Sequence, residues 1–123
     1  MKLLLDTHIL LWALADDPRL SARHKACLQD PDTDLYVSAV SIWEVAIKRR
    51  LGKLDVPKQF ASLVAQTNAS PLEISWQHGE RAGDLPLLHN DPFDRLLIAQ
   101  AQIEGMPLMT EDQKIRQYDV ALV

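Results

Sequence analysis

The sequence predicts an α/β fold, namely a three-layer α/β/α sandwich around a central, mainly parallel sheet of four to five strands. Short apolar runs alternate with longer segments of helical periodicity along the 123 residues. The run Leu3-Leu4-Leu5 is apolar without alternation, which is typical of a central strand covered by helices on both faces. Seven evenly spread prolines and the absence of a linker predict a single domain over residues 1–123.

The expected strands are short and apolar, and turn residues separate them from the expected helices. We expect strands at Lys2–Asp6, Leu35–Ser38, Leu72–Ser75 and Leu108–Thr110, with a weaker one at Val120–Val123. We expect helices at Thr7–Ala15, Ser21–Gln29, Ala39–Leu51, Lys58–Thr67, Trp76–Asp84, Pro92–Glu104 and Asp112–Gln117.

The composition excludes several classes of protein. The chain is 47% apolar and 24% charged, which is globular usage and not that of a disordered protein. The net charge of −4 argues against nucleic-acid binding by bulk charge alone. The single Cys27 excludes an internal disulfide and fits a reducing cytoplasm. No apolar run approaches the roughly 20 residues of a membrane helix, so we expect a soluble, cytoplasmic protein without a membrane segment.

Acidic residues stand where strands end and helices begin. Asp6 ends the first strand and can cap the helix that follows. Asp91 caps the helix that opens with Pro92, and Asp94 lies in its first turn, where it suits the helix dipole. Asp112 follows the last well-defined strand and can also act as a cap. Each acid alone therefore has a structural explanation.

Glu44 is the acid that capping explains least well. Ser41 and Glu44 have the spacing of a capping box, which would leave Glu44 in solvent. The helical projection instead places it on the face of Val40, Ile47 and Leu51. A carboxylate in an apolar stripe is costly unless it is paired or bound to a metal.

Four acids at one sheet edge call for a counterion. Like charges about 4 Å apart repel by ~1 kcal/mol in water, and by several times that when they are partly buried. Oxygen ligands favour Mg²⁺ or Mn²⁺ over zinc. The histidines have no zinc spacing: we expect His8 and His89 near the acidic edge but not as ligands, and His24 and His78 on the surface.

Four short motifs in this order resemble the PIN domain, the metal-dependent nuclease fold of VapC-type toxins from bacterial toxin–antitoxin pairs. They are Leu4-Leu5-Asp6-Thr7-His8, Ser38-x-x-Ser41-x-Trp43-Glu44, His89-x-Asp91-Pro92-Phe93-Asp94-Arg95 and Gly105-x-Pro107-Leu108-x-Thr110-x-Asp112. The resemblance covers essentially the whole chain, and the third motif is similar to that of one PIN subgroup.

The resemblance implies an endoribonuclease that hydrolyses RNA phosphodiester bonds with Mg²⁺ or Mn²⁺. It also implies a cognate antitoxin and a homodimer. The metal would be bound by an acidic quartet, with Asp91 either behind the metal ligands or simply a cap. The implied quartet is Asp6, Glu44, Asp94 and Asp112, with Thr7, Ser38 and Thr110 as supporting hydroxyls.

Basic residues near these acids are candidates for contacts with RNA phosphates. The densest basic patch, on the helix that carries Glu44, consists of Lys48, Arg49, Arg50 and Lys53. Arg95, next to Asp94, is a second candidate for a phosphate or a carboxylate partner. A solvated helix face, with cations favoured near its C-terminus, explains the patch equally well.

Two alternatives remain from other functional classes. The first is a PIN-fold binding module without catalytic activity, against which the intact set of four acids argues. The second is a phosphoacceptor receiver domain, which needs an acidic pair after the first strand and a phosphorylatable mid-chain Asp. Only Asp6 ends that strand, and Asp55 lies in an expected loop, so this alternative is the weaker one.

Overall fold

The structure, a computed structural model, describes residues 1–123 and contains one parallel sheet with the strand order β3-β2-β1-β4. Its strands are β1 (Lys2–Leu5), β2 (Asp34–Ser38), β3 (Ser70–Leu72) and β4 (Leu108–Met109). A single bridge between Leu108 and Leu122 stands in place of the fifth strand expected at Val120–Val123.

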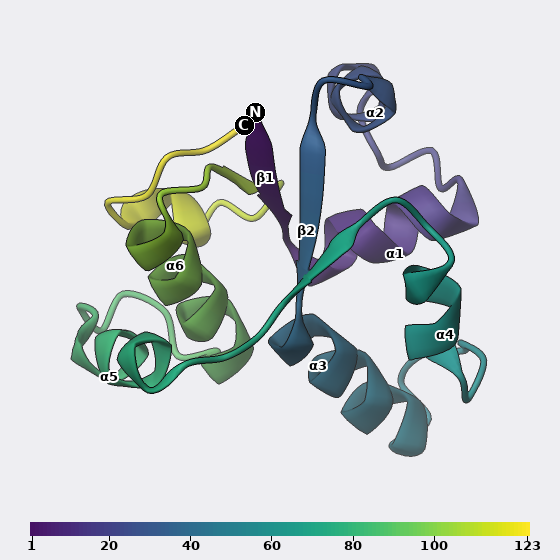
Figure 1. Cartoon of the computed structure of the whole chain (residues 1–123). Helices are drawn as coiled ribbons and strands as arrows, with labels where there is room; N and C mark the ends of the chain where they lie inside the picture. The colour runs from purple at the N-terminus through teal and green to yellow at the C-terminus, as the bar shows by residue number, and fades with distance from the viewer.

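Helices cover both faces of this sheet, which confirms the predicted three layers (Figure 1). One face carries α5 (Trp76–Asp84), α6 (Pro92–Glu104) and the 3₁₀ turn η1 (Ile115–Gln117). The other carries α1 (Thr7–Ala15), α2 (Ala22–Gln29) and α4 (Phe60–Ala65). Helix α3 (Ala39–Arg50) continues from the end of β2 and contributes to both layers. No helix is both long and apolar enough to cross a membrane.

Strand β1 lies at the centre of the molecule, as its unbroken apolar run predicted. Successive side chains of a strand point to opposite faces of the sheet. Leu4 packs into the cluster under α6, whereas Leu3 and Leu5 pack into the cluster under α1. All three are at most 3% exposed, so this strand joins the two halves of the core.

Side-chain caps fix where three helices begin, and they thereby fix the positions of the site residues on those helices. Asp6 accepts a hydrogen bond from His8 N at the start of α1, and Ser38 accepts one from Val40 N at the start of α3. Asp91 caps α6. Because Ser38 is the cap of α3, the capping box that the spacing of Ser41 and Glu44 would allow does not form, in agreement with the helical projection.

Three expected elements are displaced or shortened. Strand β3 spans Ser70–Leu72 instead of Leu72–Ser75, and it tolerates Pro71 because it is an edge strand. The expected helix Lys58–Thr67 shrinks to α4, which has no side-chain cap. The expected helix Asp112–Gln117 shrinks to η1 because Asp112 accepts a hydrogen bond from Lys114 N, which favours a turn.

The expectation that His24 and His78 lie on the surface is wrong, since they are 1% and 2% exposed. Nε2 of His24 lies 2.8 Å from the main-chain oxygen of Val123. Nδ1 of His78 accepts a hydrogen bond from Ser75 N, and its Nε2 lies 3.0 Å from Glu104. Both imidazoles join chain segments distant in sequence, a role that helical spacing alone does not reveal.

Candidate active site

The candidate site lies at the carboxyl ends of the strands, where the strand order reverses. Strand β1 has β2 on one side and β4 on the other, so the connections leaving β1 and β4 diverge. Such a switch point opens a crevice in parallel sheets. Asp6 and Thr110 directly follow β1 and β4, and Ser38 is the last residue of β2, so all three lie at this edge, as the sequence predicted.

Thr110 connects two of the predicted acids. Its hydroxyl donates a short hydrogen bond to Oδ2 of Asp6 and accepts one of 3.0 Å from Asp112 N. Asp6 is only 2% exposed, and its other oxygen accepts the hydrogen bond from His8 N. These contacts fix the Asp6 carboxylate and place Asp112 beside it.

Glu44 points inward, as the helical projection predicted, and is 2% exposed. Its Oε2 lies 2.6 Å from Nζ of Lys48, whereas its Oε1 is buried without a hydrogen-bond partner. Burial by itself lowers the pKa of the Lys48 ammonium, but the hydrogen bond to Glu44 and the surrounding carboxylates raise it overall. A buried carboxylate oxygen without a partner is costly, and a bound cation would satisfy it.

Asp91 and Asp94 have different environments. Asp91 is the helix cap, because its Oδ1 accepts hydrogen bonds from the main-chain N–H groups of Phe93 and Asp94. Oδ2 of Asp94 lies 2.7 Å from Nε2 of His89. Burial raises the pKa of the Asp94 carboxyl to about 6, although the hydrogen bond with His89 lowers it. The negative charges of the nearby Asp91, Asp6 and Glu44 carboxylates raise this pKa further.

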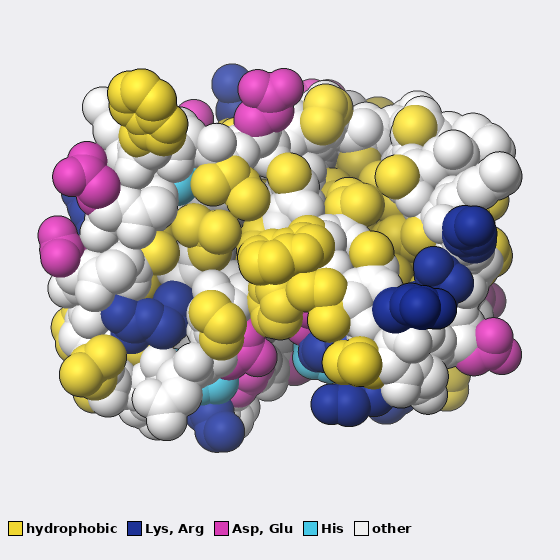
Figure 2. All heavy atoms as spheres, turned by 90° about the horizontal axis from the view of Figure 1, so that it is seen from below, with side chains coloured by type: hydrophobic (Ala, Val, Ile, Leu, Met, Phe, Trp, Pro, Cys, Tyr) yellow, Lys and Arg dark blue, Asp and Glu magenta, His cyan; other side chains and the backbone are white.

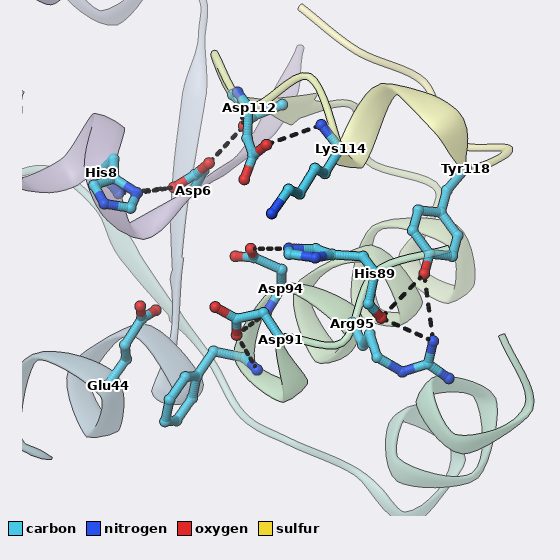
Figure 3. Close-up of polar contacts among 12 residues, drawn as sticks. Asp6, His8, Glu44, His89, Asp91, Asp94, Arg95, Asp112, Lys114 and Tyr118 are labelled. Carbon is cyan, nitrogen blue, oxygen red and sulfur yellow. Dashed lines mark hydrogen bonds and ion pairs between the residues drawn. The ribbon is translucent and has the colours of Figure 1, made fainter. Parts of the chain in front are cut away.

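The four predicted acids surround one space between α3, α6 and the ends of β1 and β4 (Figure 3). Within it, ligand atoms of His89, Asp94 and Asp112 all lie within 4.8 Å of one another. The structure thus places Asp94 and Asp112 in one cluster with His89, and Asp6 and Glu44 border this cluster. Sequence reasoning placed His89 nearby without a ligand role. The sequence did contain one signal for this role, because His89 stands two residues before Asp91, the cap of α6, and thus close to Asp94.

The supporting hydroxyls hold the elements of the site together. Thr7 donates a hydrogen bond of 2.8 Å to the Ser41 hydroxyl, which joins α1 to α3 inside the protein. Ser38, fully buried, is committed to its cap. The exposed Lys114, which the sequence analysis did not single out, extends its ammonium toward the carboxylates (Figure 3).

Arg95 does not fit the expected phosphate contact. Its guanidinium donates hydrogen bonds to the main-chain oxygens of Ala82, Leu85 and Pro86, at 2.8, 3.0 and 3.0 Å. These bonds tie the end of α5 and the following loop to α6. We therefore assign Arg95 a structural role. Arg49 and Arg50, in the last turn of α3, make no such contacts.

An apolar surface borders the site. Ala46 and the half-exposed Trp43 of α3 line, with α4 and β3, an apolar pocket of about 440 Å³. Trp43 also packs edge-on against Phe93, with ring centroids 5.3 Å apart. Viewed onto this end of the molecule, hydrophobic side chains cross the centre of the face, and carboxylates, histidine and cations lie along its lower part, with further cations at the right (Figure 2).

Known proteins share both the sequence pattern and the fold. The chain is 30% identical to the ribonuclease VapC22 of Mycobacterium tuberculosis over 94% of its length and 90% of the relative's. It is 39% identical to VapC16 of the same organism, but there the match spans only 50% of this chain and 49% of the relative. The crystal structure of VapBC2 from Rickettsia felis bound to promoter DNA contains a chain of similar fold, with a TM-score of 0.73 and 18% sequence identity. The alignment covers 99% of this chain and 96% of that chain. The PIN domain pattern matches residues 3–121, and the chain therefore belongs to the PIN domain family.

Proposed function

We propose that this chain is a metal-dependent endoribonuclease that acts as the toxin of a toxin–antitoxin pair in the cytoplasm. The observation that carries the proposal is the convergence of Asp6, Glu44, Asp94 and Asp112 on one space. Such a concentration of buried negative charge is unfavourable without a cation. The names of the matched relatives, both ribonucleases, point to the same activity.

The residues of the site suit a divalent ion. Carboxylate oxygens predominate, and Oε1 of Glu44 is buried without a partner. Oxygen ligands are those that Mg²⁺ and Mn²⁺ accept. Asp94 and Asp112 would hold the ion most directly, with Asp6 and Glu44 completing the set. When bound, the ion lowers the pKa of a water molecule and neutralises charge on the reacting phosphate.

The chain's own residues orient the reaction. Hydrogen bonds from Thr110 and from the start of α1 fix the position of the Asp6 carboxylate. Lys48 partly neutralises the charge of Glu44, which reduces the repulsion between the site and the RNA phosphates. Arg49, Arg50 and Lys114 are the cations available to contact RNA phosphates on either side. The mechanism requires no side-chain nucleophile.

The partners of this proposal are RNA, a cognate antitoxin and a second copy of the chain in a homodimer. The apolar surface around Trp43 supports a protein partner, because an exposed patch of this kind marks interaction sites. A solved structure of similar fold, with a TM-score of 0.66, is described as a toxin–antitoxin complex from Klebsiella pneumoniae.

The test is cleavage of a panel of structured RNAs in EDTA, Mg²⁺ or Mn²⁺, comparing the wild type with Asp6→Asn. The variant keeps the helix cap but removes a charge from the site. Metal-dependent cleavage that disappears in the variant supports the proposal. Cleavage that persists unchanged reveals a contaminating nuclease. RNA that is bound but never cut indicates the binding module that the sequence left open.

A further inference from the structure

We propose that His89 supplies a nitrogen ligand to the metal held by Asp94 and Asp112, and that it thereby gives the site a preference for Mn²⁺ over Mg²⁺. The inference rests on the proposed function only in requiring a divalent ion at this site. It concerns which ion is held and by which atoms, and it is tested without RNA.

The positions of the three side chains suit a shared ion. Ligand atoms of His89, Asp94 and Asp112 lie within 4.8 Å of one another. Nε2 of His89 is 2.7 Å from Oδ2 of Asp94. Neighbouring ligands of an octahedral ion with bonds of ~2.1 Å lie about 3 Å apart, so one ion can replace the proton between these two atoms with little movement.

The protein also holds His89 in place from behind. The main-chain oxygen of His89 lies 3.5 Å from both the Arg95 guanidinium and the Tyr118 hydroxyl. The same two groups hold Pro86 O at 3.0 and 2.9 Å, earlier in the loop. Figure 3 shows both groups directed at the main chain of His89. The His89 side chain is 11% exposed. A ligand fixed before the metal arrives needs less ordering when it binds.

A nitrogen ligand changes which ion is preferred. Mg²⁺ strongly favours oxygen, whereas imidazole is a good ligand for transition metals, whose affinities exceed that of Mg²⁺ once nitrogen is present. If His89 instead only oriented Asp94 through a hydrogen bond, its loss would weaken both ions alike. The two roles therefore differ in a measurable ratio.

The experiment uses the full chain, stripped of metal at neutral pH. Pulsed electron paramagnetic resonance of bound Mn²⁺ should show coupling to a histidine nitrogen in the wild type and none in His89→Gln. In competition titrations, Mn²⁺ affinity should fall roughly 10- to 100-fold in His89→Gln, with a much smaller change for Mg²⁺. His8→Gln is the matched control: its imidazole is 59% exposed and lies outside the three-residue cluster, so the nitrogen coupling should persist.

Two results would overturn the inference: no nitrogen coupling in the wild type, or an equal loss of Mn²⁺ and Mg²⁺ affinity in His89→Gln. Circular dichroism checks that this variant is folded, and the spectrum of the wild type is informative by itself. Nitrogen coupling without RNA cleavage would contradict the proposed function and leave this inference intact. Metal-dependent cleavage without nitrogen coupling would do the reverse.

Discussion

The ammonium of Lys48 lies 2.6 Å from Oε2 of Glu44, one turn earlier on α3. The Glu44 side chain is 3% exposed and that of Lys48 is 30% exposed, so the lysine covers a carboxylate that the protein has otherwise withdrawn from water. In the metal-free protein, this pair partly offsets the cost of placing a negative charge beside Asp94.

Replacing Lys48 by methionine should therefore destabilise the metal-free protein. Glu44 would remain buried with neither oxygen paired to a cation, and such a loss costs about 1–3 kcal/mol of unfolding free energy. Urea denaturation in EDTA measures the effect. Added Mg²⁺ should restore more stability to this variant than it adds to the wild type.

Two further variants separate the ion pair from the loss of a lysine. The double variant Lys48→Met/Glu44→Gln removes the buried charge as well and should recover much of the stability. Lys53→Met removes an exposed lysine just beyond α3 and should change little. A double variant as unstable as Lys48→Met would show that lost packing, and not charge, is responsible.

Asp94 should make the stability of the metal-free protein fall as the pH rises from about 4 to 6. Burial raises the pKa of this carboxyl to about 6 from an unfolded value of 3.8, so the folded state holds the proton more tightly. The stabilisation that this proton provides is present in full below pH 4 and is lost as the pH rises through 6. A shift of this size corresponds to about 3 kcal/mol of unfolding free energy, which denaturation across this pH range measures.

The variant Asp94→Asn removes the titrating group and should flatten this part of the pH profile. Asp16→Asn makes the same charge change at an exposed carboxylate paired with Lys25 and should leave the profile as in the wild type. If the wild-type profile rises between pH 4 and 6 relative to that of Asp94→Asn, the carboxyl is not buried as the structure shows.

Much of the fold was predictable because local signals agreed with the tertiary structure. The run Leu3-Leu4-Leu5 predicted a central strand, and Asp6 and Asp91 both cap helices that begin at the site. Helical periodicity and capping residues predicted the wrong structure where a side chain forms its own hydrogen bond with the main chain. Asp112 accepts a hydrogen bond from Lys114 N and so forms a turn in place of the expected helix.

The site was predictable only as a list of residues. Spacing along the chain placed Glu44 and Asp94 on inward faces, and both are buried. It could not show that Lys48 lies against Glu44 or that His89 folds back over Asp94, since these contacts depend on rotamers and on a loop without periodicity. The same holds for Arg95: its charge suggested a phosphate or a carboxylate partner, whereas in the structure its partners are main-chain oxygens and the Tyr118 hydroxyl.

Arg95 should be more important for the loop after α5 than for RNA. Arg95→Lys keeps the charge but cannot reach the three oxygens that the planar guanidinium contacts together. We expect a loss of about 1–3 kcal/mol in unfolding free energy, because buried acceptors lose their donors. Hydrogen exchange should show faster opening of residues 85–91. Unchanged stability and exchange, together with weaker RNA binding, would restore the original interpretation.

Arg49 and Arg50 are the residues whose loss should affect RNA binding without affecting stability. Both lie in the last turn of α3, beyond Glu44, and neither is held by a carboxylate. Each contact with a phosphate releases a condensed counterion, so Arg49→Ala and Arg50→Ala should each reduce the salt dependence of binding by about one ion or less.

Binding is measured to labelled RNA at several salt concentrations, in the Asp6→Asn background so that the RNA stays intact. Lys25→Ala, on α2 at the opposite end of the molecule in Figure 1, should leave the slope unchanged. If all three variants show the same salt dependence as the parent protein, Arg49 and Arg50 are only a solvent-exposed helix face. RNA would then approach from the side of Lys114.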